Sequence, residues 1–305
     1  MSLSLVHHSC YTVPFPPRHR FPIGKFAALK AHLDRGPFAD RFRHVVPEPA
    51  DAALLERAHT TGYVADVLAC RLDPTAIRRI GVPVTPPVVM RATASVGGTV
   101  AAVEAALDRG IASNTAGGSH HAHAGFGAGF CVFNDVAVAA CHAHATGRAG
   151  RVVIIDLDVH QGDGTARILE DQPWAVTFSM HGARNFPVRK ARSTIDIELP
   201  DGTGDAAYLD QLEDALPGLL DAPRPDLVIY LAGVDPHRDD RLGRLALTDR
   251  GLAAREHLVL DRCLARGIPV ATVLGGGYDE DVEALARRHA LAIETAVRLA
   301  EAYRL

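Results

Sequence analysis

The sequence lacks the features that mark membrane, secreted and nucleic-acid-binding proteins. No uninterrupted apolar stretch approaches the about 18–20 residues of a membrane span. The five cysteines are odd in number and scattered, with no CxxC pair, which indicates free thiols in a reducing compartment. A net charge of −4 argues against a nucleic-acid-binding surface. The start has no basic segment followed by an apolar one, so we expect no secretory signal and a cytoplasmic location.

The composition is that of an ordinary globular protein, with 48% hydrophobic and 22% charged residues in a chain of 305. The first ~85 residues look irregular and proline-rich, with helical patterns only at 24–35 and 51–69. The later chain alternates helices with short apolar strands. We expect helices at 88–109, 134–146, 206–220, 249–266 and 279–303, and strands at 152–155, 175–179, 227–231 and 269–274. This alternation predicts an α/β fold with a mostly parallel central sheet between two helical layers, as a single domain over residues 1–305.

One segment, RVVIIDLDVHQGDG at 151–164, carries an unusual number of ionisable groups for the end of a buried strand. Burying a charge is costly unless a partner or a metal compensates it. Side chains two apart on an extended segment point to the same side, so Asp156, Asp158 and His160 can converge, with Asp163 close behind. Carboxylate and imidazole are ligands of divalent metals such as zinc. Read alone, the segment could also be an Asp-rich turn with a surface histidine.

Polar residues also follow the other predicted strands. Met180 and His181 follow the strand at 175–179, Asp235 lies in AGVDPH after the strand at 227–231, and GGGY follows the strand at 269–274. In open parallel sheets, ligands bind beyond the carboxyl ends of the strands. Asp235 is a turn or helix-cap residue on its own, but with Asp158 and His160 it completes the three protein ligands of a catalytic metal site.

Two further motifs suggest proton transfer. His120 and His121 lie side by side in the glycine-rich GGSHHA, and histidine titrates near working pH. Such histidines need carboxylates behind them, and Asp156 and Asp163 are available. Tyr278 follows three glycines that can aim its phenol at a developing oxyanion. The alternatives are a surface histidine loop and a phosphate-binding turn, although GGGY lacks the spacing of the known phosphate-binding motifs.

Two loop aromatics, Phe130 and Phe186, have nothing obvious to bury against. Each is an ordinary loop anchor when considered alone. If they face each other, they form an apolar slot for an extended alkyl chain.

The motifs together resemble those of the histone deacetylase family, within the arginase/deacetylase superfamily. They occur in the family's order over most of the chain and read HRFP, GGSHHA, GFCVFND, DLDVHQGDG, AGVDPHRDDRLGRLALT and GGGY. Gln161, the DDRLGRLALT block and the compact length are most similar to class IV deacetylases and their bacterial relatives. The resemblance implies an arginase/deacetylase-like fold.

The resemblance also implies roles for the residues. Asp158, His160 and Asp235 would bind one zinc ion per chain, although iron stays open as the native metal. His121 would be the general base and later the general acid, and His120 its electrostatic companion, with Asp163 and Asp156 behind them. Tyr278 would stabilise the oxyanion. The tunnel for the acyl chain would be formed by Gly129, Phe130 and Phe186. A structural potassium ion would lie near Asp156, Asp158, His160, Ser179 and Met180.

The expected activity is therefore zinc-dependent removal of an acetyl or longer acyl group from an acyl-lysine or related amine. An acetylpolyamine or other small-molecule amide is the alternative substrate. A dinuclear manganese ureohydrolase would need a further carboxylate cluster, which GVDPH does not offer. A non-catalytic acyl-ligand sensor would have no use for Tyr278. The sequence does not predict the length of the acyl group or the oligomeric state. His123 is an extra histidine relative to the family pattern and has no assigned role.

Overall fold

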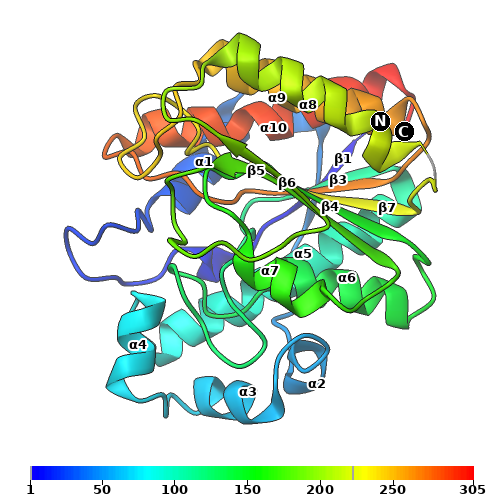
Figure 1. The fold of residues 1–305 in the computed structure, drawn as a ribbon. Coiled ribbons are helices and arrows are strands. Elements are labelled where there is room, and N and C mark those ends of the chain that lie inside the picture. The colour runs from blue at the N-terminus through cyan, green and yellow to red at the C-terminus, as the bar shows by residue number, and fades with distance from the viewer. Residues whose placement is uncertain (1, 222) are drawn as a thin grey trace.

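The computed structural model describes residues 2–221 and 223–305, and a sheet of eight strands runs through its centre (Figure 1). Every pair of neighbouring strands is parallel. In order across the sheet, the strands are β2 (Phe42–Val45), β1 (Leu3–Val6), β3 (Ile111–Asn114), β8 (Val270–Val273), β7 (Leu227–Leu231), β4 (Val152–Asp156), β5 (Ala175–Gly182) and β6 (Ile195–Leu199).

Helices cover both faces of this sheet (Figure 1). One layer consists of α1 (Lys25–Arg35), α8 (Asp205–Leu220), α9 (Asp249–Leu264) and α10 (Val282–Ala302). The opposite layer consists of α5 (Pro86–Arg109), α6 (Asp135–Ala145) and α7 (Asp163–Leu169), with α2 (Ala52–Leu55), α3 (Thr61–Leu68) and α4 (Pro74–Ile80) farther from the sheet. The predicted three-layer α/β architecture is confirmed.

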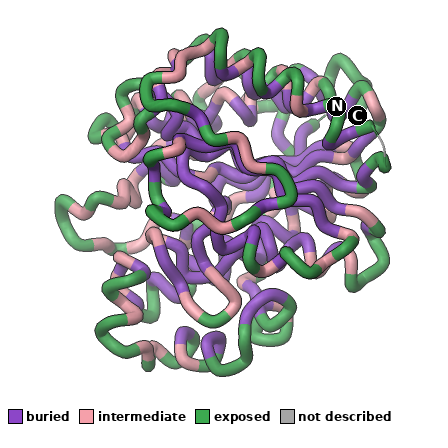
Figure 2. Tube along the Cα trace, viewed as in Figure 1, coloured by how far each residue is buried: buried purple, intermediate pink, exposed green. Residues whose placement is uncertain are grey.

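The apolar side chains of the central strands divide between two cores. In β4, Val153 and Ile155 pack into the core under α8, α9 and α10, whereas Val152 and Ile154 pack into the core under α5 and α6. This follows from the alternation of side chains along a strand. A strand buried on both faces therefore has no polar position until it ends, and Figure 2 shows the central strands as buried.

The early part of the chain is more regular than we expected. It contains β1 and β2, and the single helix expected at 51–69 is two helices, α2 and α3. The strands escaped notice because they are four residues long and β2 exposes its two central residues, Arg43 and His44. Helix α4 had a readable signal, because Asp73 caps its first turn ahead of a proline and Gly81 ends it with a positive φ of 79°.

Four further elements differ from what we expected. Strand β3 lies just before GGSHHA, where we had predicted no strand. Helix α7 begins at Asp163, inside the DLDVHQGDG motif. Strand β5 continues to Gly182, so Met180 and His181 lie within it and do not follow it. Strand β6 was missed because its edge position leaves the alternating IDIEL mostly solvent-accessible.

The order of the strands places the loops that follow β3, β8, β7 and β4 next to one another at one edge of the sheet. Those loops contain the two adjacent histidines, GGGY, Asp235 and Asp158–Asp163. Among the described residues, no helix has the combined length and apolar character needed to cross a membrane.

Candidate active site

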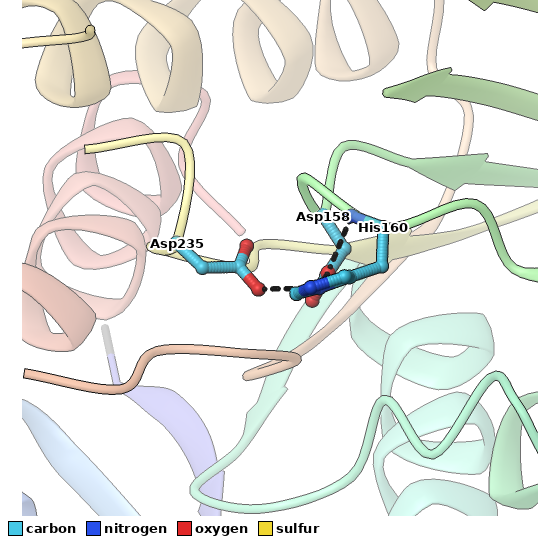
Figure 3. A group of neighbouring side chains, drawn as sticks. All are labelled: Asp158, His160 and Asp235. Carbon is cyan, nitrogen blue, oxygen red and sulfur yellow. Dashed lines mark hydrogen bonds and ion pairs between the residues drawn. The ribbon is translucent and has the colours of Figure 1, made fainter. Parts of the chain in front are cut away.

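Asp158, His160 and Asp235 converge at the carboxyl ends of β4 and β7 (Figure 3). One ligand-type atom from each lies within 4.8 Å of the others. Nδ1 of His160 is 3.0 Å from Oδ1 of Asp158 and 3.0 Å from Oδ2 of Asp235. All three side chains are buried. The three residues predicted as metal ligands are thus brought together, although their chain positions are far apart.

The surroundings of this triad fit a cation. Two buried carboxylates face each other, and burial together with the Asp158 charge raises the pKa of Asp235 to about 7. Burial alone would lower the pKa of His160, but its bonds to the two carboxylates raise it to about 10. A Cβ at Gly276 would clash with both carboxylates, so the glycine leaves the space beside them free. Two carboxylates and one imidazole are a donor set that suits zinc.

The adjacent histidines each have a carboxylate partner. Nδ1 of His120 lies 2.7 Å from Oδ2 of Asp156, and Nδ1 of His121 lies 2.7 Å from Oδ1 of Asp163. The rings are 4.1 Å apart between centroids. These are the same pairs that the family resemblance implied.

The two histidines have opposite proton affinities. Burial opposes the charge on His120, but Asp156 outweighs it and raises the pKa of His120 to about 9. Burial and the neighbouring His120 lower the pKa of His121 to about 4. Burial would raise the pKa of Asp163, but its bonds to His121 and His123 hold it well below its usual range. His121 is therefore neutral near pH 7 and can accept a proton, whereas His120 holds one.

Asp163 also contacts a third histidine. Oδ2 of Asp163 is 3.2 Å from Nε2 of His123, and the His123 ring stacks on Phe126 at 4.4 Å between centroids. The sequence had left His123 without a role, and the structure places it behind the carboxylate that orients His121.

Tyr278 approaches the triad from the loop after β8. Its ring centroid is 6.0 Å from that of His160, nearly perpendicular to it. The preceding turn requires glycine, because Gly275 and Gly277 have φ values of 68° and 151°. Burial, reinforced by Asp158, raises the pKa of Tyr278 well above its usual range. The phenol therefore keeps its proton and can act as a hydrogen-bond donor.

A cavity of about 330 Å³ opens next to these groups. Phe130 and Phe186 both line it, as do His121, His160 and Tyr278. Phe186 stands edge-on to His121 with 4.8 Å between ring centroids. Gly129 lies at the same wall, where a Cβ would come within 2.5 Å of the His121 ring. The predicted tunnel residues thus share one cavity with the catalytic candidates.

The residues expected near potassium lie on neighbouring strands. Asp156 of β4 is in register with Ser179 of β5, and Met180 follows it. Oδ1 of Asp156 accepts a hydrogen bond from the N–H of Asp158 at 3.1 Å. The potassium site stays a prediction.

Sequence reasoning missed several residues that support the site. Asp240 accepts a hydrogen bond from the N–H of Tyr278, and Asp135 accepts from the N–H groups of Gly118 and Ser119. Lys25 is buried, and its Nζ donates to the carbonyl of Gly275 at 3.1 Å. Burial lowers the pKa of Lys25 to about 8 despite the nearby Asp235 and Asp158. The only sequence signals were the resemblance motifs FND and DDRLG, which do not single out these acids.

Comparison with known proteins agrees with this geometry. The sequence model of the histone deacetylase domain family matches residues 19–295 of this chain. The chain belongs to the histone deacetylase family. Similarity to the HD domain of HDA15, with a TM-score of 0.79 at 23% identity over 96% of this chain and 90% of that one, shows the same fold.

The relatives differ in how much of their own length this chain matches. An uncharacterized protein of Picosynechococcus sp. is 47% identical over 291 residues, which are 95% of this chain and 97% of that one. Histone deacetylase 2 of Arabidopsis thaliana is 38% identical over 60% of this chain and 48% of its own length. A probable deacetylase of Archaeoglobus fulgidus is 30% identical over 77% of this chain and 70% of its own. The chain thus spans about half the length of the plant relative.

Proposed function

We propose that this protein is a zinc-dependent amidohydrolase that removes an acetyl or longer acyl group from an acyl-lysine or a related acylated amine. Membership of the histone deacetylase family supports a deacetylase activity. The observation that carries the proposal is that one triad of metal ligands and two His–Asp pairs gather beside one cavity, which His121, His160 and Tyr278 line. The two phenylalanines that line the cavity, Phe130 half-buried and Phe186 exposed, suit an acyl-lysine side chain entering from solvent.

Asp158, His160 and Asp235 would hold the zinc ion. When bound, zinc polarises the amide carbonyl and lowers the pKa of water towards ~7. The donor set leaves room for a further ligand, as catalytic zinc sites with three protein ligands do.

The chain's own residues would move the protons. His121 accepts a proton from the attacking water and later gives it to the leaving amine. Its Nδ1 is occupied by Asp163, so Nε2 is the atom that exchanges the proton. His120, charged beside Asp156, favours the negative charge that develops on the substrate oxygen. Tyr278 donates its phenolic proton as a hydrogen bond to that oxygen.

The experiment that tests this proposal is Tyr278→Phe in zinc-reconstituted protein. Removing one oxyanion donor typically lowers kcat ~100–1000-fold. We expect that loss on an acetyl-lysine reporter, with zinc content by mass spectrometry unchanged because Tyr278 is not a ligand. Tyr303→Phe, at the exposed end of α10, is the matched control and should retain full turnover. Near-normal activity of Tyr278→Phe would contradict the assigned role.

A panel of substrates tests the class of activity. Acetyl-, medium-chain and long-chain acyl-lysine peptides and acetylpolyamines should reveal at least one turned-over amide. If zinc-loaded protein binds a hydroxamate and cleaves none of them, the protein is a sensor of acyl ligands.

A further inference from the structure

The mouth of the cavity is lined by arginines from three separate loops. Arg20 comes from the proline-rich segment near the start, Arg184 from the loop after β5 and Arg244 from the loop after β7. None of the cavity-lining residues is Asp or Glu. The chain as a whole carries a net charge of −4, so this positive cluster runs against the overall balance.

These arginines are only partly neutralised by the protein. Asp201 is shared, at 3.2 Å from Nη1 of Arg244 and 3.8 Å from Nη1 of Arg184. Arg20 has no carboxylate within ion-pair distance in the described part of the chain. Three positive charges therefore face one negative charge, which leaves an excess of two.

The arginines also lack another structural purpose among the described residues. None of the three lies over an aromatic ring in a cation–π contact. The side chains of Arg184 and Arg244 are 78% and 55% exposed. Guanidinium groups in this state are free to bind carboxylate or phosphate oxygens in pairs of hydrogen bonds.

We infer that the mouth selects an acylated amine that carries a negative charge close to the scissile amide. The inference rests on the proposed function, because it concerns the part of the substrate that stays outside the acyl cavity. Two sources share this chemistry: an acyl-lysine flanked by Asp or Glu in a polypeptide, and a free Nε-acyl-lysine with its α-carboxylate. Polyamines and arginine-rich tails place like charges against Arg20, Arg184 and Arg244, and are disfavoured.

A matched peptide series tests the preference. Acetyl-lysine is placed between two Glu, two Gly or two Arg residues, and kcat/KM is measured with zinc-reconstituted enzyme at low salt. We expect the Glu peptide to exceed the Arg peptide by about tenfold or more, because a cleft lined by one sign of charge concentrates the opposite sign. The ratio should shrink at about 1 M salt, where the screening length falls to about 3 Å. A preference for the Arg peptide, or none, would overturn the inference.

The source is distinguished by free Nε-acetyl-lysine and its α-amide. If the α-carboxylate raises kcat/KM over the α-amide by more than the flanking Glu residues raise it over Gly residues, the preferred substrate is a small molecule. The reverse identifies an acidic polypeptide.

Variants attribute the effect to the named residues. In the double variant Arg20→Gln with Arg244→Gln, the ratio of Glu to Arg peptide should fall towards one. Arg43→Gln, an exposed arginine on edge strand β2 outside the cavity, is the control and should keep the wild-type ratio. An unchanged ratio in the double variant would mean that other groups set the preference.

Binding separates this inference from the proposed function. Dissociation constants of the same three peptides, measured by fluorescence anisotropy, do not require turnover. If no peptide is hydrolysed but the Glu peptide binds most tightly, the hydrolase proposal fails and the charge selection stands. If all are hydrolysed alike and bind alike, the charge selection fails and the hydrolase proposal stands.

Discussion

The backbone N–H of Tyr278 donates a 2.7 Å hydrogen bond to Oδ2 of Asp240. Oδ1 of the same carboxylate accepts from the N–H groups of Leu242 and Gly243, at 2.8 and 2.9 Å. One half-buried carboxylate thus connects the loop after β7 with the turn that carries the phenol. Since glycines precede Tyr278, this bond is a main restraint on where its backbone lies.

Asp240→Ala should therefore lower kcat without removing the phenol. A displacement of about 1 Å at a reacting group can cost about a hundredfold in rate, and we expect a loss of that order with zinc content retained. The double variant with Tyr278→Phe should be no slower than Tyr278→Phe alone, because both changes disable the same group. Asp239→Ala, at an exposed acid that pairs with Arg288, is the control. Additive losses in kcat would show that Asp240 acts through some other residue.

Metal content offers a second prediction. Asp235→Ala removes one of three ligand-type side chains, so the purified protein should lose most of the one zinc per chain expected for wild type. Asp163→Ala is the matched control, because its carboxylate contacts His121 and His123 and lies outside the triad. It should keep zinc and lose turnover. Two manganese ions per wild-type chain would instead favour a ureohydrolase.

The sequence predicted the metal-ligand candidates and the two adjacent histidines better than the residues that hold them in place. Asp158 and His160 could be paired because a strand that is apolar on both faces ended in charged residues at alternate positions. The hydrogen bonds of His120 and His121 join the carboxylates expected from the same motif. The end of strand β4 restricts where Asp156, Asp158 and His160 can lie.

Asp240 shows why the rest was not predictable. It lies next to Asp239, and nothing in the sequence tells the two acids apart. Asp240 turns inward to three N–H groups, whereas Asp239 pairs with Arg288 at the surface. The difference depends on how two loops pack, and short edge strands such as β2 were missed for a similar reason. Their pairing partners, and not their own residues, decide that they are strands.

His123 gives a third prediction. His123→Phe keeps the stack on Phe126 but removes the 3.2 Å contact with Asp163. Asp163, which orients His121, then loses one of its two histidine contacts. We expect kcat to fall about tenfold, because losing a partner that orients a site residue indirectly typically costs about 10–100-fold. KM should change little, because His123 does not line the cavity. His257→Phe, on the exposed side of α9, should change neither constant. A raised KM at unchanged kcat would contradict a role through Asp163.

Acid stability gives the last prediction, through the buried His59. Its Nδ1 is 3.0 Å from the carbonyl oxygen of His123, and its Nε2 accepts a hydrogen bond from the N–H of Asn134 at 2.9 Å. This arrangement requires the neutral ring with its proton on Nδ1, because a proton on Nε2 would face the N–H of Asn134. Burial accordingly lowers the pKa of His59 to about 4.

Between about pH 6.5 and pH 4 the unfolded chain binds a proton at His59 that the folded chain does not. The contribution of His59 to the free energy of unfolding should therefore be complete above pH 6.5, fall as the pH drops through this window and level off below pH 4, with a loss of about 1.4 kcal/mol by pH 5.5. Burial lowers the pKa of His7 and His181 to about 4 with the same sign, whereas the raised pKa values of His120 and His160 act in the opposite direction, so the His59 contribution is the difference between wild type and a His59 variant. Urea unfolding of metal-free protein at pH 7.5 and 5.5 measures it. His59→Gln should show a smaller fall than wild type, whereas His257→Gln should match wild type. Equal falls in all three proteins would show that His59 does not titrate differently in the folded and unfolded chains.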